Sequence, residues 1–203
     1  MKHCKVCFKE IDNEIFINDL LNVKEHELCY ECFNKMELVL KNIRILDYKI
    51  FILLKYNSYI KELIYKFKGL YDIELKNIFL EYFKDIIEEK YQGYTLTFAP
   101  SSKEDDLKRG FNHVKEMFSF WKGDKRDCFY KKNQIKQSSR NHLQRKEIVN
   151  DIGLNLDALK GVKKLLIVDD IVTTGNTINV CANLVKKHKN IKIKLLSICI
   201  SKF

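Results

Sequence analysis

An apolar run followed by two adjacent acids and a hydroxyl-rich turn, residues 165–177, is the feature that most limits the fold of this chain. Leu165–Val168 is a short run typical of strands buried on both faces of a parallel sheet. Asp169 and Asp170 follow at its expected carboxyl end, and the apolar spacing of residues 177–187 predicts a helix beyond the turn. In such α/β folds, ligands bind at the carboxyl ends of the strands.

The turn has the chemistry of an anion site. Its small and hydroxyl-bearing residues offer side-chain donors and approachable backbone N–H groups: Thr173, Thr174, Gly175, Asn176 and Thr177. The helix amino end adds unpaired N–H groups and a positive dipole end. Acids beside a phosphate would repel it, so we expect them to face sugar hydroxyls or a metal ion. The alternative is an ordinary strand-to-helix turn in which Thr and Asp serve as caps.

The order acid-acid-x-x-Thr-Thr-Gly-x-Thr resembles the phosphoribosyl-pyrophosphate (PRPP) signature of type I phosphoribosyltransferases. That resemblance implies that Asp169 and Asp170 hold the ribose 2′ and 3′ hydroxyls and act as the catalytic acids by offsetting charge that develops on the sugar. It implies that residues 173–177 hold the 5′-phosphate. Mg²⁺ is expected to bridge pyrophosphate and ribose oxygens.

Four cysteines near the start form two Cys-x-x-Cys pairs: Cys4 with Cys7, and Cys29 with Cys32. This spacing predicts a structural zinc site in a small module with little core of its own, whose folding energy the metal would largely supply. Four protein ligands leave no open coordination position, so we do not expect zinc catalysis. A redox-active cysteine pair and a set of buried thiols are the alternatives.

The rest of the chain predicts a second domain. We expect a helix over 33–45 that ends a zinc module of residues 1–45, and a main domain over 46–203. Strands are predicted at 48–56, 95–99 and 191–200, and helices at 58–68, at 73–91 with a buried apolar stripe, and from about 109 to 121. Residues 101–106 are predicted to form a polar loop.

Arg109 and Gly110 begin a tetrapeptide, Arg-Gly-Phe-Asn, with possible phosphate chemistry. Arg109 can fork onto phosphate oxygens and Gly110 allows close approach of the backbone. A solvated arginine at a helix start is the alternative. Residues 122–150, rich in basic and amide groups, are interpreted either as a flap over a charged substrate or as an exposed linker.

The chain as a whole resembles the ComF (GntX-like) family. The resemblance is carried by Arg-Gly-Phe-Asn, the stretch from Gln137 to Lys146, the acid-pair signature and the cysteines. It implies a phosphoribosyltransferase-like fold with an N-terminal zinc finger and a role in late DNA uptake by competent bacteria. Single-stranded DNA and helicase-type competence proteins are the implied partners. This chain departs from the family in the loop after Pro100, where Glu104, Asp105 and Asp106 lie at the expected pyrophosphate site. Their negative charge does not fit pyrophosphate unless Mg²⁺ or nearby basic residues compensate for it.

Net charge and hydropathy restrict the function further. Lys and Arg exceed Asp and Glu by 37 − 27 = 10. This excess favours anionic partners, although solvated lysine-rich faces account for it equally well. A non-catalytic single-stranded DNA-binding factor is therefore the alternative to a PRPP-binding enzyme. No P-loop is present, and we expect a cytoplasmic protein without a membrane span.

Overall fold

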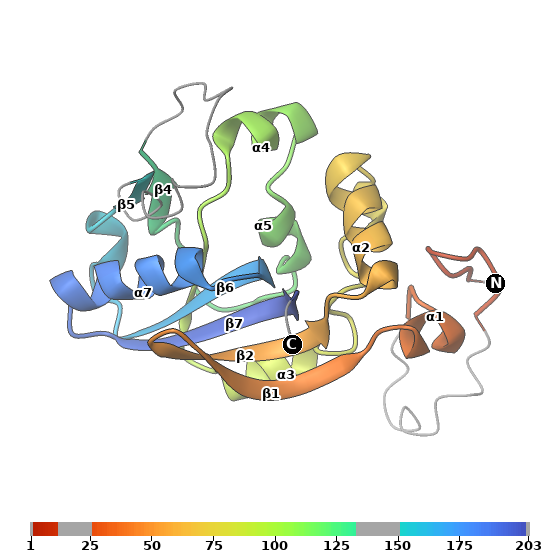
Figure 1. Ribbon diagram of the computed structural model, residues 1–203, viewed down its shortest axis with the longest axis horizontal. Helices are drawn as coiled ribbons and strands as arrows, with labels where there is room; N and C mark the ends of the chain where they lie inside the picture. The colour runs from red at the N-terminus through yellow and green to blue at the C-terminus, as the bar shows by residue number, and fades with distance from the viewer. Residues whose placement is uncertain (1, 12–25, 133–150, 202–203) are drawn as a thin grey trace.

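A five-stranded sheet in the order β1-β2-β7-β6-β3 forms the centre of the protein (Figure 1). The computed structural model describes residues 2–11, 26–132 and 151–201. The strands are β1 (Leu38–Ile45), β2 (Tyr48–Lys55), β3 (Thr95–Phe98), β6 (Lys164–Val172) and β7 (Lys192–Ile200). All neighbours are parallel except β1 and β2, which are antiparallel. The expected α/β class with a mostly parallel sheet is confirmed.

Each face of the sheet carries its own apolar core. Leu165 and Ile167 of β6 pack in one cluster with Ile178 and Val185 of α7 (Asn176–His188). Because side chains alternate along a strand, Leu166 and Val168 enter the other cluster. That second cluster includes residues of α2 (Ser58–Ile64), α3 (Lys84–Lys90) and α5 (His113–Met117).

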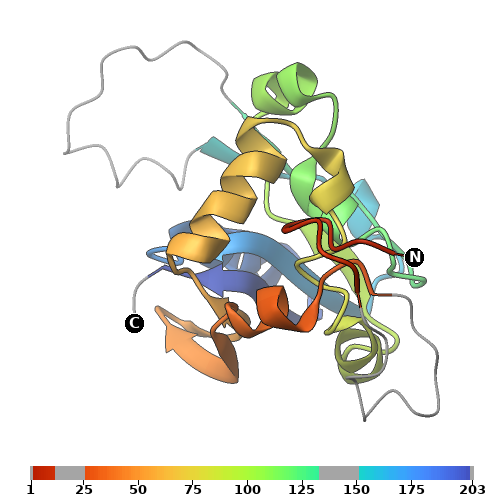
Figure 2. The ribbon, with the colours of Figure 1, turned by 90° about the vertical axis from the view of Figure 1, so that its right-hand side faces the viewer.

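Shorter elements complete the fold. They are α1 (Tyr30–Asn34), the π-helix η3 (Tyr65–Gly69), the 3-10 helices η4 (Ile73–Leu75) and η6 (Asp157–Leu159), α4 (Lys103–Arg109), and the antiparallel pair β4 (Phe129–Lys131) and β5 (Ile152–Leu154). The N-terminal segment and α1 lie beside α2, at the end of the molecule away from α7, and face the viewer in Figure 2. Within the described ranges, no helix has the length and apolar character needed to cross a membrane.

The prediction of a helix over residues 33–45 is wrong. The helix α1 ends at Asn34, and residues 38–45 form the edge strand β1. Val39, Ile43 and Ile45 of this strand pack half-buried against the α7 core, across an irregularity of register. A half-buried edge strand with a bulge carries apolar residues at spacings that also fit a helix. Because β1 belongs to the sheet, we propose that the segment with the four cysteines, the cysteine module, ends before Leu38 rather than at residue 45 as expected for the zinc module.

Other helices also differ from expectation. The helix predicted over 73–91 is interrupted between η4 and α3, in a stretch where Ile78, Phe79 and Leu80 are buried in succession. Ile86, in the segment predicted to carry a buried apolar stripe, is 46% exposed. The polar loop after Pro100 contains α4, capped by Ser102, with acids in its first turn and Arg109 in its last. The helix expected to reach residue 121 is α5, which begins at His113 and ends at Met117.

The remaining predicted elements are confirmed. Strands β2, β3 and β7 and helix α7 lie where the apolar patterns place them. The helix expected over 58–68 is present as α2 followed by η3, which ends at Gly69.

Candidate functional site

The two acids lie inside β6 rather than beyond its end. Strand β3 pairs with β6 only as far as Val168, whereas β7 continues to pair with it up to Val172. Asp169 and Asp170 therefore occupy the stretch of β6 that extends past β3, at the carboxyl edge of the sheet. The prediction that this strand ends at Val168 is wrong, because pairing with β7 extends β6 by four residues, to Val172.

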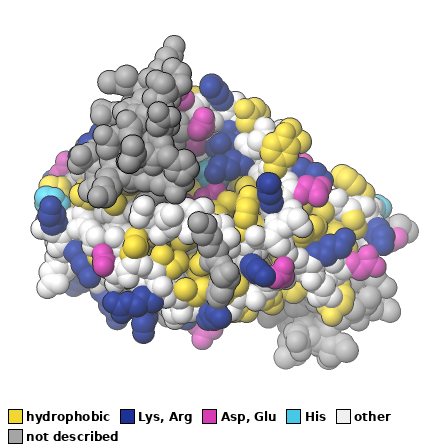
Figure 3. All heavy atoms as spheres, viewed as in Figure 1, with side chains coloured by type: hydrophobic (Ala, Val, Ile, Leu, Met, Phe, Trp, Pro, Cys, Tyr) yellow, Lys and Arg dark blue, Asp and Glu magenta, His cyan; other side chains and the backbone are white. Residues whose placement is uncertain are grey.

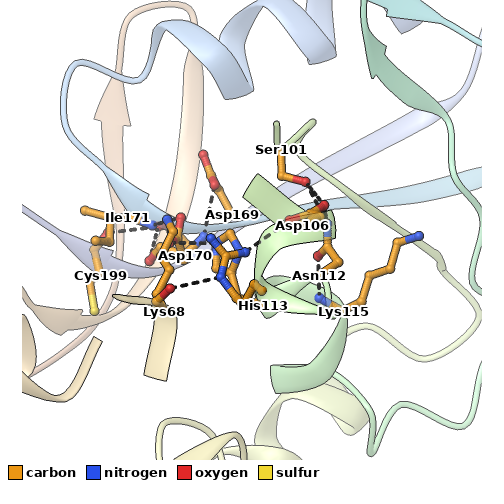
Figure 4. A network of polar contacts seen from close by, with 12 residues as sticks. Lys68, Ser101, Asp106, Asn112, His113, Lys115, Asp169, Asp170, Ile171 and Cys199 are labelled. Carbon is orange, nitrogen blue, oxygen red and sulfur yellow. Dashed lines mark hydrogen bonds and ion pairs between the residues drawn. The ribbon is translucent and has the colours of Figure 1, made fainter. Parts of the chain in front are cut away.

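Asp170 is buried in a network of donors (Figure 4). Its Oδ2 accepts hydrogen bonds from Lys68 Nζ and His113 Nε2, both at 2.9 Å. Its Oδ1 accepts from the Ile171 backbone N–H at 2.9 Å. A buried carboxylate with this many donors is held in its charged form.

Arg109 fixes the tautomer of His113. The guanidinium Nη1 lies 3.3 Å from His113 Nδ1, and arginine can only donate. Nδ1 must therefore accept, which puts the imidazole proton on Nε2, where it faces Asp170. Arg109 also donates to the Lys68 carbonyl oxygen and to Asp106. Its side chain is 6% exposed, so contact with a phosphate requires it to exchange one of these bonds.

The pKa values of the two acids move in opposite directions. Burial acts to raise the pKa of Asp170, but the His113 hydrogen bond and the Lys68 charge outweigh it and hold that pKa well below its usual range. Burial, and then the neighbouring Asp170 charge, raise the pKa of Asp169 well above its usual value. Asp169 also adds to the burial-driven rise in the pKa of Cys181 in α7.

Asp169 and Asp170 point to opposite sides of β6. Adjacent residues of a strand alternate between faces, and Asp169 points away from Lys68 and His113 in Figure 4. Its influence on Cys181 is consistent with a position on the α7 side. The structure thus separates the two acids that the sequence places side by side. Asp170 is buried against Lys68 and His113, whereas Asp169 lies on the side of the α7 amino end.

The bend after β6 has the features of an anion cradle. In the part of the chain that the structure describes, no acceptor is paired with the backbone N–H of Thr173, Thr174 or Gly175. Gly175, the N-cap of α7, has no side chain to cap the helix, and the Asn176 N–H of the first turn makes only a long contact of 3.5 Å to Thr174 Oγ1. These free donors and the helix dipole converge on one place.

Gly175 is the residue that permits this bend. Its φ is +77°, a left-handed conformation that glycine adopts without strain. A Cβ at this position would lie 2.5 Å from Cγ2 of Ile45 in β1. Both the backbone conformation and the packing against β1 therefore exclude a larger residue.

Asp106, on α4, is satisfied within the protein. It accepts from Arg109 and from Asn112 Nδ2 at 2.8 Å, and Ser101 Oγ donates to it as well. Gly110, with φ +82°, ends α4, and its N–H donates to the Asp106 and Leu107 carbonyls. Charged and histidine side chains gather between α2 and α5 in Figure 3.

A cavity of about 400 Å³ lies beyond this network at the carboxyl end of β3. Its walls come from the loop after β3, from α4 and from the β4–β5 pair. Lys103 and Lys131 lie on its walls, and no ion pair joins either to an acid among the described residues. Lys115 lines it too, so three lysines against Asp106 and Asp127 give the cavity a net basic character.

The four cysteines form a cluster suited to a metal ion. The sulfurs of Cys4, Cys7, Cys29 and Cys32 all lie within 4.8 Å of one another, and Cys7 and Cys29 are 3.7 Å apart. Tetrahedral Zn–S bonds of about 2.3 Å place sulfurs about 3.8 Å apart. No disulfide joins these cysteines. The donor set and its spacing fit a structural metal site, as expected from the sequence.

The cysteine module is also tied to the main domain by polar contacts. Lys5 forms an ion pair with Glu74, and the Glu27 backbone N–H donates to Glu81. Burial raises the pKa of Glu81 to about 7. In the module, burial raises the pKa of Cys32 to about 12, whereas backbone N–H groups outweigh burial at Cys4 and lower its pKa to about 7.

One family model matches part of this chain. The family description "Phosphoribosyl transferase domain" matches residues 125–201, which include β6, the bend and α7. Adenine phosphoribosyltransferase from Thermoanaerobacter pseudethanolicus is 14% identical, with a TM-score of 0.37 over 79% of this chain and 95% of that chain. No curated protein matches the sequence.

Two residues of the network were not among the expected site residues. Lys68 is 102 positions from Asp170, so no local pattern links them. His113 directly follows Arg-Gly-Phe-Asn, and that neighbourhood is a signal that could have identified it. The basic stretch proposed as a flap, with Gln137 to Lys146, lies mostly outside the described residues. Two of its described basic residues, Lys125 and Arg126, donate to backbone carbonyls.

Proposed function

We propose that this protein binds PRPP at the carboxyl edge of its sheet and that the chemistry of the site is phosphoribosyl transfer. The unpaired N–H groups of the bend, directly beyond Asp169, carry this proposal. They suit the 5′-phosphate, and Asp169 suits the ribose hydroxyls. The match of residues 125–201 to the phosphoribosyl transferase domain supports the same ligand.

In this proposal the residues of the bend and the two acids have different roles. Thr173, Thr174, Gly175, Asn176 and Thr177 bind the 5′-phosphate. Asp169 orients the ribose and offsets positive charge on the sugar as the bond to pyrophosphate breaks. Asp170, Arg109 and Gly110 shape the site from behind, since all three are engaged within the protein.

The metal ions have separate places. Zn²⁺ would be held by Cys4, Cys7, Cys29 and Cys32 as a structural ion. Mg²⁺ would enter with PRPP, held mainly by ligand oxygens and water, and supply charge neutralisation to the pyrophosphate. Among the described residues only the cysteines form a cluster of three or more metal-binding side chains.

Calorimetry with PRPP and Mg²⁺ tests the proposal, followed by product analysis with candidate nucleobases. We expect Mg²⁺-dependent binding that Thr174→Val and Asp169→Asn weaken, because each removes a ligand contact. Turnover with any base identifies an enzyme, and binding without turnover identifies a sensor of PRPP. Absence of PRPP binding by the wild-type protein contradicts the proposal.

A second candidate function is binding of single-stranded DNA, within a ComF-like role in DNA uptake with helicase-type competence partners. It is favoured by lysines at the end of the sheet opposite the acids. Lys164 and Lys192 lie directly opposite each other on neighbouring strands, and Lys186 and Lys187 lie in the last turn of α7. Affinity that falls steeply with salt supports this function, and insensitivity to charge reversal at these lysines and at Lys131 and Lys132 contradicts it.

A further inference from the structure

We propose that Lys68 contacts the pyrophosphate group of bound PRPP and that Asp170 positions the Lys68 amine for this contact. The inference rests on the proposed PRPP site and adds a residue to it. Lys68 Nζ lies 2.9 Å from Asp170 Oδ2, and the Lys68 side chain is 37% exposed whereas that of Asp170 is 10% exposed. A buried acid thus holds a cation whose other side faces solvent.

The hydrogen-bonding capacity of this pair leaves room for a ligand. Asp170 has a donor on each oxygen without Lys68, from His113 Nε2 and the Ile171 N–H. The lysine amine has three protons and, among the described residues, donates only to Asp170. Two N–H groups therefore remain for phosphate oxygens.

The backbone around Lys68 fixes the position of its side chain. Lys68 lies in the π-helix η3, and its carbonyl accepts a hydrogen bond from Arg109 Nε at 3.0 Å. The preceding residue, Phe67, is fully buried against Phe79 and Phe111. Single π-helical turns are rare and occur frequently at functional sites.

The distance along β6 assigns Lys68 to the pyrophosphate rather than to the 5′-phosphate. Asp170 precedes the bend at Thr173 by three residues, roughly 10 Å of extended strand. One phosphate cannot reach both places, whereas PRPP carries anionic groups on two sides of its ribose. Arg109, the other cation of the network, is buried and already bonded to three acceptors. Of the two cations Lys68 and Arg109, Lys68 is therefore the one that a ligand can reach.

Calorimetric titration of the full chain with PRPP and Mg²⁺ tests the role of Lys68. We expect Lys68→Met to weaken PRPP binding by about tenfold or more, because a charged hydrogen bond is lost. Lys68→Gln, which retains a donor for Asp170, should show the same loss and keeps the test available if the methionine variant unfolds. Lys66→Met is the matched control, since Lys66 is on the same element, has a side chain that is 41% exposed and pairs with Glu62.

A double-mutant cycle tests the positioning role of Asp170. If Asp170 acts through Lys68, Asp170→Asn weakens PRPP binding in the wild type but adds no further loss to Lys68→Met. Additive losses, or a Lys68→Met affinity within about twofold of the Lys66→Met control, overturn the inference while the PRPP site stands. A wild-type protein that does not bind PRPP overturns both.

Discussion

The amine of Lys68 lies 2.9 Å from the carboxylate of Asp170, which follows it by 102 positions. This ion pair joins the helical layer formed by α2 and η3 to the carboxyl end of β6. Asp170 is therefore bonded within the protein, to Lys68 and His113, whereas Asp169 points away from both (Figure 4). Predictions for the two acids therefore differ.

Asp170→Asn is expected to destabilise the protein by about 2 kcal/mol at pH 7, because Lys68 and His113 lose a charged acceptor. The pKa of Asp170 is lowered in the folded state, so its contribution is present above the unfolded value of about 3.9 and is lost as pH falls below it. The stability difference between wild type and variant should therefore narrow below about pH 4. Urea unfolding at pH 7 and pH 3 measures this stability difference. A difference that does not change with pH would contradict the lowered pKa of Asp170 in the folded state.

Asp169→Asn is expected to stabilise the protein at neutral pH while it weakens PRPP binding. Burial and the Asp170 charge raise the pKa of Asp169 in the folded state, so its contribution is present below the unfolded value and lost as pH rises through the folded value. Removal of the charge should then add about 0.5–2 kcal/mol at pH 7, and the gain should disappear below about pH 4. Chemical denaturation measures this gain, with Glu89→Gln as the control for loss of an exposed acid. An unchanged or lower stability at pH 7 would show that desolvation and the Asp170 charge do not destabilise the Asp169 carboxylate.

Gly175→Ala is expected to cost about 2 kcal/mol or more and to reduce PRPP affinity, because it combines a left-handed φ with a clash against Ile45. Ile45→Ala removes the clashing Cγ2 atom. The double variant should therefore recover part of the stability lost by Gly175→Ala, although the φ penalty remains. Thermal unfolding of the two single variants and the double variant checks this coupling, and strictly additive losses would rule it out.

Cys7→Ser is expected to abolish binding of one zinc ion per chain, because a tetrahedral site loses one of its four thiolates. We expect the cysteine module to depend on zinc, so amide protons of residues 26–34 should exchange faster with solvent in the variant while those of β6 and β7 keep their protection. Elemental analysis and hydrogen exchange measure the two effects. Full zinc occupancy in the variant would exclude Cys7 as a ligand.

Phe8→Gly is expected to stabilise the cysteine module by about 1 kcal/mol, because Phe8 has a φ of 60° that costs a side-chain-bearing residue strain. Phe8 is 76% exposed, so little apolar contact is lost. Phe8→Ala, which keeps the Cβ, is the control and should show no such gain. A competition assay with a zinc chelator compares the three proteins, and equal zinc affinity of the glycine and alanine variants would contradict the strain argument.

Much of the fold could be predicted from the sequence because its central strands are continuous apolar runs. Strand β6 and helix α7 were evident from Leu165–Val168 and the helical spacing beyond the bend. The strand β1 was missed because it is a half-buried edge whose apolar residues fit two periodicities. The helix α4 was missed although Ser102 and the charges at its two ends are helix signals.

The candidate site was predictable only where its residues are neighbours in the chain. The bend and the four cysteines have local spacings that reflect their chemistry. The burial of Asp170 was not predictable, because it depends on Lys68 and His113, which α2, η3 and α5 bring to β6 from distant parts of the chain. Adjacent acids in a sequence also do not reveal that a strand directs them to opposite faces.

The edge strand β1 links the cysteine module to the protein's solubility. It directly follows that module and covers β2, whose residues 50–54 are all buried. A strand of this kind becomes a template for intermolecular pairing when its edge is uncovered. Loss of the metal would loosen the segment that anchors β1, so we expect zinc-depleted protein to aggregate before its parallel strands unfold.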